Sequence, residues 1–383
     1  MQMKILHIIT SLRIGGAERM VSELLPRLRN RRHNVELLLF DGTRSSLYDH
    51  IEQEGIMIHT LGKGTMQMWN PLHVFRLRKF LHRKRFDIVH THNTPCQLLA
   101  ALAAGKNAPM LVTTEHNTFN RRRNWRWYAA IDRWMYGKYD YVICVGEKVK
   151  ENLMARLYKN ADSANIAVVP NGVDLKRFTD SVLYSSKKKD EYIIIMVAAF
   201  RKQKDQPTLL RAMQYLPDNY TLWFAGDGKQ KKECERLVNT LGISRRVRFL
   251  GDRDDVLQLL VTADVVVLSS HYEGFGLAIV EGMATGKPVI ASDVDGLHDI
   301  VAGAGLLFPH EDHKRLAELI RQVCENKEYG SEVAASCREK VMQYDIENTI
   351  YGYEKIYDKL MHRRNYEKTV EVDLLPNSKI EYT

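Results

Sequence analysis

The chain lacks any apolar run close to the ~18 residues that a membrane-spanning helix needs, although 45% of its 383 residues are hydrophobic. Cysteine is scarce, and the five residues are odd in number and widely spaced, at Cys96, Cys144, Cys234, Cys324 and Cys337. This spacing fits neither a disulfide framework nor a paired-cysteine zinc site. The N-terminus MQMKILHIITSLRIGGAE has no small-residue cleavage site, so we expect a buried first strand rather than a signal peptide. Together these absences favour a cytoplasmic protein with reduced thiols.

An excess of acidic charge is also missing, because the net charge is +9 at pH 7. Residues 1–180 hold 28 Lys and Arg against 16 Asp and Glu, whereas residues 181–383 hold 28 against 31. Basic surfaces attract phosphate-bearing partners, which include nucleic acid and anionic lipid. We therefore expect the first half of the chain to face an acidic partner or a membrane.

Two sets of short apolar runs, bounded by turn residues, alternate with helical patterns along the chain. The first set lies at 4–10, 34–40, 57–61, 87–92, 110–116 and 141–146, and the second at 192–200, 220–226, 247–251, 264–270, 287–292 and 305–309. Near-continuous apolar strands separated by helices indicate parallel sheets that are covered on both faces. The sequence thus predicts an α/β protein with two Rossmann-like parallel-sheet domains that face a cleft, with ligands at the carboxyl ends of the strands.

A polar, serine-containing segment at 174–192 separates the two sets and predicts an interdomain linker. We expect a first domain at 1–184, a second at 185–345, a helix at 346–365 and a loosely held tail at 366–383.

The segment SSHYEGFGLAIVEGMATGKPVIAS at 269–292 places two glutamates in apolar, glycine-rich surroundings. Glu273 lies in a turn after a buried strand, and Glu281 lies in a helix that ends before Gly286. The first backbone N–H groups of that helix favour a phosphate. A carboxylate among apolar residues is costly unless it accepts hydrogen bonds, which the two hydroxyls of a ribose would donate. The alternative is a helix-start charge at Glu273 and a solvent-facing Glu281.

The same segment resembles the E-x7-E motif of glycosyltransferase family 4, whose members are retaining nucleotide-sugar transferases with the two-domain GT-B fold. Further segments resemble the family in order along the chain: SLRIGGAERMVSELLPRL, DIVHTHN, VTTEHN, VVPNGVD, FAGDG, VRFLGDRDDV, ADVVVLSS and GLLFP. The resemblance implies a donor nucleotide in the second domain, an acceptor in the first, and a last helix that crosses back to the first domain.

Carried over residue by residue, the resemblance implies that Glu281 binds the ribose hydroxyls and that Glu273 faces the donor sugar. Lys204 would neutralise the diphosphate, which gains charge as the glycosidic bond breaks, and the alternative is a solvated lysine at a helix start. The family usually has an arginine five residues before this lysine. Ala199 occupies that position here, so Arg201 is the candidate replacement. Backbone groups would supply the remaining donor contacts, at Gly251, Phe275, Gly276 and Leu277.

In the first domain, Gly15 and Gly16 follow the first strand, where the resemblance implies a loop that lets the backbone approach the diphosphate. His116 matches the family's active-site histidine near the donor sugar, although neutral histidines also cap strand ends in a structural role. His90 and His92 alternate along a strand end. We expect them to point to opposite faces of the sheet, so that they do not both line one cleft.

The segment SDVDG at 292–296 has the spacing of a metal-binding DxD motif. It follows a strand, however, and its residues favour a surface turn. We expect no metal, and no cofactor either, because the nucleotide-sugar is itself a substrate.

The segment 120–140 combines five arginines with Trp125, Trp127 and Trp134. Interfacial helices mix basic and aromatic residues in this way, and the alternative is a core helix with packed tryptophans and solvated arginines. Together with the basic first half, the segment motivates the hypothesis that the first domain touches the anionic inner face of a membrane and receives a lipid-linked acceptor.

The sequence therefore predicts a metal-independent, retaining glycosyltransferase of the hexosyltransferase type. It would move a sugar from a nucleotide-sugar, UDP-sugar rather than GDP-sugar, to a hydroxyl of a glycan or lipid-linked glycan precursor in surface polysaccharide synthesis. A nucleotide-sugar epimerase on the same fold is the enzymatic alternative, and it would need an acid–base pair but no acceptor. A dehydrogenase is disfavoured, because RIGGAER stands in place of G-x-G-x-x-G. A basic, non-catalytic nucleic-acid-binding protein would rest on charge alone, and we expect no nucleic-acid partner.

Overall fold

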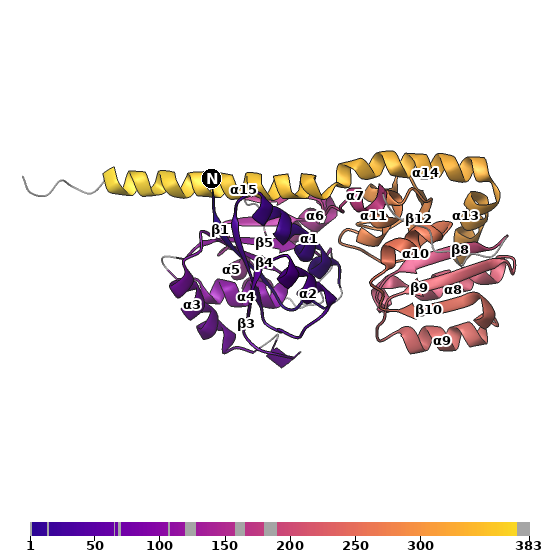
Figure 1. Ribbon diagram of the computed structural model, residues 1–383, viewed down its shortest axis with the longest axis horizontal. Coiled ribbons are helices and arrows are strands. Elements are labelled where there is room, and N and C mark those ends of the chain that lie inside the picture. Colours follow the sequence, from indigo (N-terminus) through magenta and orange to yellow (C-terminus); the bar gives the residue numbers. More distant parts are fainter. Residues whose placement is uncertain are drawn as a thin grey trace, which may run out of the picture.

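The computed structural model describes residues 2–13, 15–64, 66–67, 70–105, 108–118, 128–157, 165–179 and 190–373, with side chains as far as residue 365. Within these residues the chain forms two parallel sheets, each flanked by helices (Figure 1). The expected two-domain α/β architecture is thus confirmed. The predicted domain boundary, between residues 184 and 185, lies outside the described residues.

The first sheet has the strand order β3-β2-β1-β4-β5-β6-β7. Its strands are β1 Lys4–Ile9, β2 Asn34–Leu39, β3 Met57–Thr60, β4 Ile88–His92, β5 Met110–Glu115, β6 Tyr141–Cys144 and β7 Ile166–Val168. Its helices are α1 Gly16–Asn30, α2 Ser46–Gln53, α3 His73–Lys84, α4 Thr94–Ala103, α5 Tyr128–Tyr136, α6 Glu147–Leu157 and α7 Lys176–Thr179. The sequence patterns predict every one of these strands except β7, which has only three residues and shows too little pattern.

The second sheet has the strand order β10-β9-β8-β11-β12-β13. Its strands are β8 Tyr192–Val197, β9 Tyr220–Ala225, β10 Val247–Gly251, β11 Val265–Leu268, β12 Val289–Ser292 and β13 Leu306–Phe308. The helices are α8 Gln206–Ala212, α9 Lys231–Thr240, α10 Val256–Thr262, α11 Leu277–Ala284, α12 His298–Val301, α13 His313–Glu325, α14 Lys327–Val341 and α15 Ile346–Asp373. All six strands coincide with predicted apolar runs.

Alternation along β1 shows how the first sheet is covered. Leu6 and Ile8 belong to the apolar cluster that contains residues of α3, α4 and α5, whereas Ile5 and Ile9 belong to the cluster that contains residues of α1 and α15. Because successive side chains of a strand point to opposite faces, the two clusters lie on opposite faces of the sheet. Parallel strands buried on both faces need such continuous apolar sequence.

In each sheet the strand order reverses at one point, between β1 and β4 and between β8 and β11. The loops that follow these strands leave in opposite directions, and the gap between them is where open parallel sheets bind ligands. Residues after β1, β4, β8 and β11 are therefore the first candidates for a site.

The last helix, α15, returns to the first domain after α14 has covered the second (Figure 1). Its apolar stripe consists of Ile346, Ile350, Tyr353, Tyr357 and Leu360, all buried, at the three- and four-residue spacing of one helix face. The stripe joins the same apolar cluster as α1 and β1. The helix runs to Asp373, so the first residues of the predicted tail continue the helix. No helix among the described residues is both long and apolar enough to cross a membrane.

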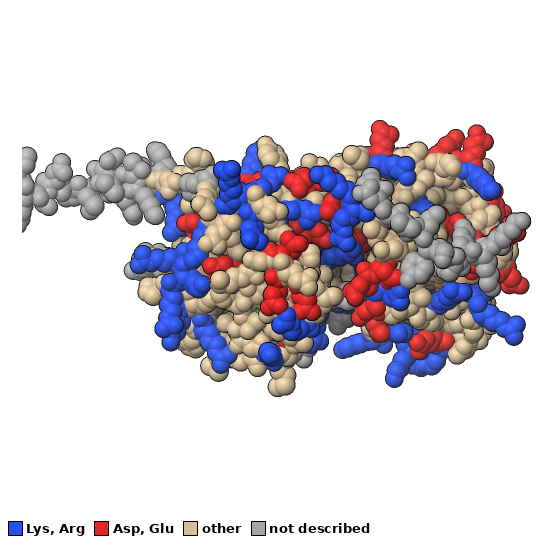
Figure 2. Space-filling model, viewed as in Figure 1, with Lys and Arg blue, Asp and Glu red and all other residues tan. Residues whose placement is uncertain are grey.

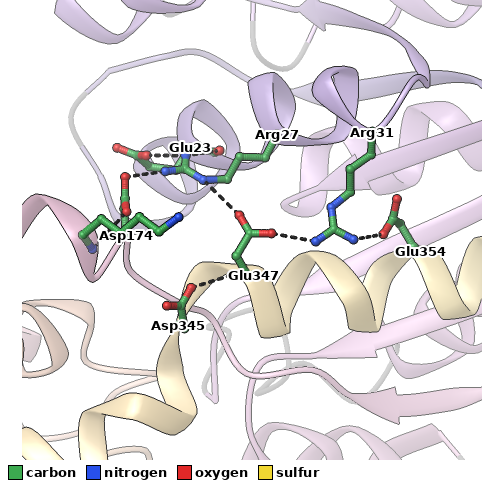
Figure 3. A network of polar contacts seen from close by, with 8 residues as sticks. Glu23, Arg27, Arg31, Asp174, Asp345, Glu347 and Glu354 are labelled. Carbon is green, nitrogen blue, oxygen red and sulfur yellow. Dashed lines mark hydrogen bonds and ion pairs between the residues drawn. The ribbon is translucent and has the colours of Figure 1, made fainter.

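Ion pairs fix α15 and the interdomain connection to α1 (Figure 3). Glu347 of α15 lies between Arg27 and Arg31, and its Oε2 is 2.6 Å from Arg31. Arg31 also contacts Glu354 at 2.6 Å, one to two turns further along α15. Arg27 contacts Asp174, just before α7, at 2.5 Å. Because the network joins α1, the connection and the returning helix, it holds together the segments that link the two domains.

Candidate functional site

Lys204 and Glu273 meet at the point where the strand order of the second sheet reverses. Lys204 ends the short 3₁₀ helix Lys202–Lys204 after β8, and Glu273 lies in the loop after β11. The Lys204 ammonium binds the Glu273 carboxylate directly, and Ser270 Oγ donates a hydrogen bond of 2.7 Å to the same carboxylate oxygen. Both side chains are mostly buried. The Lys204–Glu273 pair therefore forms a buried charged centre at the carboxyl ends of the strands.

The turn that carries Glu273 is clamped from both domains. Thr118 of the first domain donates its hydroxyl to the Glu273 carbonyl oxygen at 2.8 Å. On the other side, the Glu273 N–H donates to the Asp295 carbonyl at 3.1 Å. A Cβ atom added to Gly274 would lie 1.9 Å from the carbonyl oxygen of His116. The two domains therefore touch at this turn, at a distance that only glycine allows.

Glu281 is buried inside α11 and does not face solvent. Only 5% of the residue is exposed, and burial raises the pKa of its carboxyl, an effect that the Arg19 guanidinium partly opposes. The Arg19 guanidinium, from α1 of the first domain, lies 3.1 Å from the Glu281 carboxylate. A buried carboxylate needs a polar partner, and in this conformation the other domain supplies it as an ion pair.

The start of α11 lies beside Glu273. Gly276 precedes the helix with φ +44°, a left-handed conformation that glycine adopts at little cost. Phe275 is buried against Tyr344, with 5.5 Å between ring centroids, so its side chain anchors the turn. The backbone N–H groups at the start of α11 lack partners within the helix and favour an anionic group.

The glycine loop of the first domain faces α11. A Cβ atom on Gly16 would lie 3.7 Å from the Leu277 side chain, so backbone of the first domain closely approaches the start of α11. Glu18 packs on Gly15, with a carboxylate oxygen 2.3 Å from where a Cβ would lie. Burial raises the pKa of Glu18, and the Arg201 guanidinium partly opposes that rise. Arg201 is exposed and thus contributes positive charge to the cleft from the second domain.

His116 follows β5 and belongs to a row of histidines, which corrects one of our expectations. His90 and His92 point to the same face of the sheet, with their rings stacked and 4.5 Å between centroids. The expectation of opposite faces was wrong, because residues two apart in a strand share a face. His92 Nδ1 lies 3.2 Å from His116 Nε2, and His92 Nε2 lies 2.9 Å from His7 Nδ1.

The buried histidines form a neutral, hydrogen-bonded array. Both ring nitrogens of His90 have partners, Tyr357 at 2.5 Å and Thr114 at 2.7 Å. His7 Nδ1 and His92 Nε2 are likewise each other's hydrogen-bond partners at 2.9 Å. Burial lowers the pKa of His7 to about 3 and that of His116 to about 4. Because a neutral imidazole has one donor and one acceptor nitrogen, the contacts of His92 with His7 and His116 couple the tautomers of these three rings.

A cleft of about 580 Å³ opens between α1 and α2 of the first domain and residues 253–256 of the second, and Lys204, Glu273 and His116 do not line it. Gly15 and Arg19 border it, whereas Glu281 borders a much smaller hollow of about 20 Å³. Gly251, with φ +72°, ends the edge strand β10, which is two strands from β8. It therefore lies at the outer side of the sheet, away from the point where the strand order reverses. In this conformation the Arg19 guanidinium lies against the Glu281 carboxylate.

The structure also describes the segment 292–296 and part of the segment 120–140. Asp293 and Asp295 lie in an exposed turn after β12, and Asp293 contacts His298 at 2.6 Å, while the Asp295 backbone supports Glu273 as described above. Trp125 and Trp127 lie outside the described residues. Trp134 lies on α5 and is 43% exposed.

Sequence reasoning missed residues that act across the domain boundary. Arg19, Thr118 and Gly274 each contact the other domain, and no local pattern reveals such partners. His7 was missed for a different reason. It stands beside His90 in the register of β1 and β4, and the pattern of histidines two residues apart on β4 was the signal that could have pointed to a shared face.

Comparisons with known proteins identify the family of both halves of the chain. The model for Glycosyltransferase Family 4 matches residues 14–177, and the model for Glycosyl transferases group 1 matches residues 184–344. The chain is 24% identical over 361 residues to the UDP-Gal:alpha-D-GlcNAc-diphosphoundecaprenol alpha-1,3-galactosyltransferase of Escherichia coli, which covers 89% of this chain and 92% of that protein. It is 27% identical over 320 residues to the putative glycosyltransferase EpsD of Bacillus subtilis, covering 78% and 84%.

Solved structures share the fold at low sequence identity. The Anabaena Alr3699/HepE structure in complex with UDP and glucose superposes with a TM-score of 0.80 at 22% identity, over 94% of this chain and 100% of that one. WaaG, a glycosyltransferase involved in lipopolysaccharide biosynthesis, superposes with a TM-score of 0.71 at 16% identity, over 93% and 99%. The likeness in fold extends over nearly the whole chain.

Proposed function

The chain belongs to glycosyltransferase family 4 and has the GT-B fold, and from that premise we propose that it is a retaining hexosyltransferase that takes a UDP-sugar and a lipid-linked glycan acceptor. The observation that carries the proposal is the arrangement of Lys204, Glu273 and Glu281 around the start of α11. It provides one group for each part of a nucleotide-sugar.

Each donor contact follows from the chemistry of the group. The Glu281 carboxylate only accepts hydrogen bonds, and a ribose offers two hydroxyl donors. The start of α11 and the Lys204 ammonium face the diphosphate, which gains negative charge as the glycosidic bond breaks. Glu273 accepts from hydroxyls of the transferring sugar while Ser270 holds it in place. Because Lys204 and the helix start supply positive charge, we propose that this reaction needs no metal.

His116 is the first-domain member of the site. Burial lowers the pKa of the His116 imidazole to about 4. At neutral pH the ring is therefore uncharged and acts as a hydrogen-bonding group and not as a cation. The Thr118 hydroxyl, two residues further on, reaches the Glu273 turn. We propose that His116 hydrogen-bonds the donor sugar where the two domains meet, and that the closed cleft excludes water from the bond that breaks.

A UDP-sugar donor is supported by two of the similar proteins. The name of the E. coli relative includes UDP-Gal and a diphosphoundecaprenol acceptor, and the Anabaena structure contains UDP and glucose.

Thermal unfolding with UDP, GDP and their sugars tests the proposal. A ligand at 100 times its Kd stabilises the folded state by about 2.7 kcal/mol, or about 5–10 °C in Tm for a domain of 150–250 residues.

UDP and one UDP-sugar are expected to give this shift, and GDP at the same concentration a clearly smaller one. Equal shifts from UDP and GDP would contradict the choice of base. A Tm that no nucleotide changes would contradict the donor site itself.

The α3–α4–α5 face of the first domain supports contact with an anionic membrane. These helices pack side by side, and they and the preceding loop expose large apolar residues: Met66, Leu72, Phe75, Leu102 and Trp134. Figure 2 shows Lys and Arg gathered at the α3 edge of the molecule, where Arg76, Lys79 and Arg83 are exposed. Apolar side chains surrounded by basic ones suit a membrane interface. We propose that this face holds the protein at the membrane, where a lipid-linked acceptor reaches the first domain.

Co-sedimentation with vesicles tests this surface. The wild type should bind vesicles that contain phosphatidylglycerol, more weakly as salt rises, and should not bind phosphatidylcholine alone. Replacing both Arg76 and Lys79 with Glu should abolish binding, since each basic residue near the membrane surface contributes about 1 kcal/mol to the binding free energy. The matched control reverses Lys232 and Arg236, which are exposed on α9 of the second domain. Equal binding by both double variants would exclude α3 from the membrane surface.

A further inference from the structure

A second cluster of charged groups lies on the second domain, partly in the loops that also carry Lys204 and Glu273. It consists of His271 from the loop after β11, His310 and Glu311 from the loop after β13, and Asp205 before α8. Each side chain offers one ligand atom, and these four atoms all lie within 4.8 Å of one another. We propose that this cluster is a zinc-binding site.

The distances within the cluster suit a tetrahedral ion. Ligand atoms about 2.05 Å from zinc in a tetrahedron lie about 3.3 Å apart. His271 Nδ1 is 2.5 Å from His310 Nε2, 3.7 Å from Glu311 Oε1 and 3.9 Å from Asp205 Oδ2. His310 Nε2 is 4.0 Å from Glu311 Oε1. These four distances are in part shorter and in part longer than the separation of about 3.3 Å between ligand atoms in an ideal tetrahedron. Small side-chain rotations would bring the ligand atoms to that separation.

The imidazole rings are oriented as ligands require. The rings of His271 and His310 lie nearly perpendicular, at 77°, and their closest approach is nitrogen to nitrogen. The rings of His7, His90 and His92 are instead stacked.

The charges of the cluster also call for a cation. Asp205 is only 6% exposed, and its Oδ2 accepts a hydrogen bond from Thr208 at 2.6 Å. The neighbouring Lys204 ammonium is bound to Glu273, so it does not neutralise Asp205. The two carboxylates of the cluster carry a charge of about −2, which one divalent ion offsets. Imidazole ligands favour zinc over magnesium, which prefers oxygen.

A metal here joins three loops of the second domain. His271 lies two residues before Glu273, and Asp205 directly follows Lys204. Backbone contacts already connect these loops, since the His271 N–H donates to the Gln203 carbonyl at 2.8 Å. Zinc would hold the loop of Lys204 to the loop of Glu273. It takes no part in sugar transfer, so the inference goes beyond the proposed function and does not depend on it.

Calorimetric titration of chelator-stripped protein with zinc chloride tests the site. The wild type should bind one zinc ion, and Mg²⁺ at the same concentration should give no heat of binding. His310→Ala and His271→Ala should each weaken zinc binding about 100-fold or more, because each removes one ligand. The matched control is His298→Ala, which removes an exposed histidine that pairs with the single carboxylate of Asp293. It should bind zinc as the wild type does.

Cobalt provides a second measurement that does not depend on affinity. Co²⁺ bound to the wild type should show the intense visible bands of tetrahedral coordination, and these should disappear in His310→Ala while the far-UV circular dichroism stays unchanged. Zinc binding by His310→Ala equal to that of the wild type would overturn the proposal, as would octahedral cobalt spectra. The UDP titration on the same stripped protein reports separately on the donor site, so failure of either site is distinguishable.

Discussion

Gly274→Ala is expected to lower kcat by about 100-fold or more, because the two domains can no longer close on the donor turn. The added Cβ would lie 1.9 Å from the His116 carbonyl oxygen, against an ordinary contact of 3.4 Å or more. The backbones would have to separate by about 1.5 Å, and a misplacement of about 1 Å at a reacting centre costs about 100-fold in rate. The loss falls on the reaction rather than on the fold, since the clash lies between domains and outside both apolar cores.

Steady-state kinetics of the variant, with far-UV circular dichroism, measure the effect. The matched control is Gly105→Ala, since a Cβ at Gly105 meets no atom within 4 Å, and this variant should keep wild-type kcat. A Gly274→Ala enzyme with unchanged kcat would show that the contact between the Glu273 turn and His116 is not needed during turnover.

Glu281→Ala is expected to weaken nucleotide binding by about 100-fold. Hydrogen bonds to a charged group contribute about 1.5–3 kcal/mol each, and loss of about 2.7 kcal/mol corresponds to a factor of about 100 in Kd. The carboxylate is buried and its present partner, Arg19, comes from the other domain. Removing it thus takes away the ribose acceptor and also leaves Arg19 without that partner.

Calorimetric titration with the preferred nucleotide measures this loss. Glu281→Gln separates hydrogen bonding from charge, because it keeps one acceptor oxygen and should lose less affinity than Glu281→Ala. Glu233→Ala, an exposed carboxylate on α9 of the same domain, should bind as the wild type does. Wild-type affinity in Glu281→Ala would remove this residue from the ribose role.

Long apolar runs in the sequence predicted their strands correctly, whereas a short run did not. Runs such as residues 264–270 are continuous apolar sequence, and a strand covered on both faces requires nothing more. Strand β7, with three residues, offered too few positions to show a pattern. The end of α15 was misplaced, because residues 366–373 carry little apolar periodicity and the helix continues from the packed part before them.

The histidines show where sequence reasoning failed. The strand through His90 and His92 was predicted, but the faces were assigned wrongly, since a period of two places both on one side. His7 completes the row only because β1 and β4 are neighbours in the sheet, although they lie far apart in the chain. Strand order decides such neighbours, and strand order is a property of the whole fold.

By itself the sequence determined that the chain forms two parallel-sheet domains and belongs to its family, because apolar runs and ordered motifs are local features that one chain displays. It also named Lys204, Glu273 and Glu281 as donor candidates. Only the tertiary structure decided what each of them touches: Lys204 binds Glu273 because β8 and β11 are adjacent, and Glu281 meets Arg19 because the domains close. Contacts between distant segments depend on strand order and domain packing, and no local pattern encodes either.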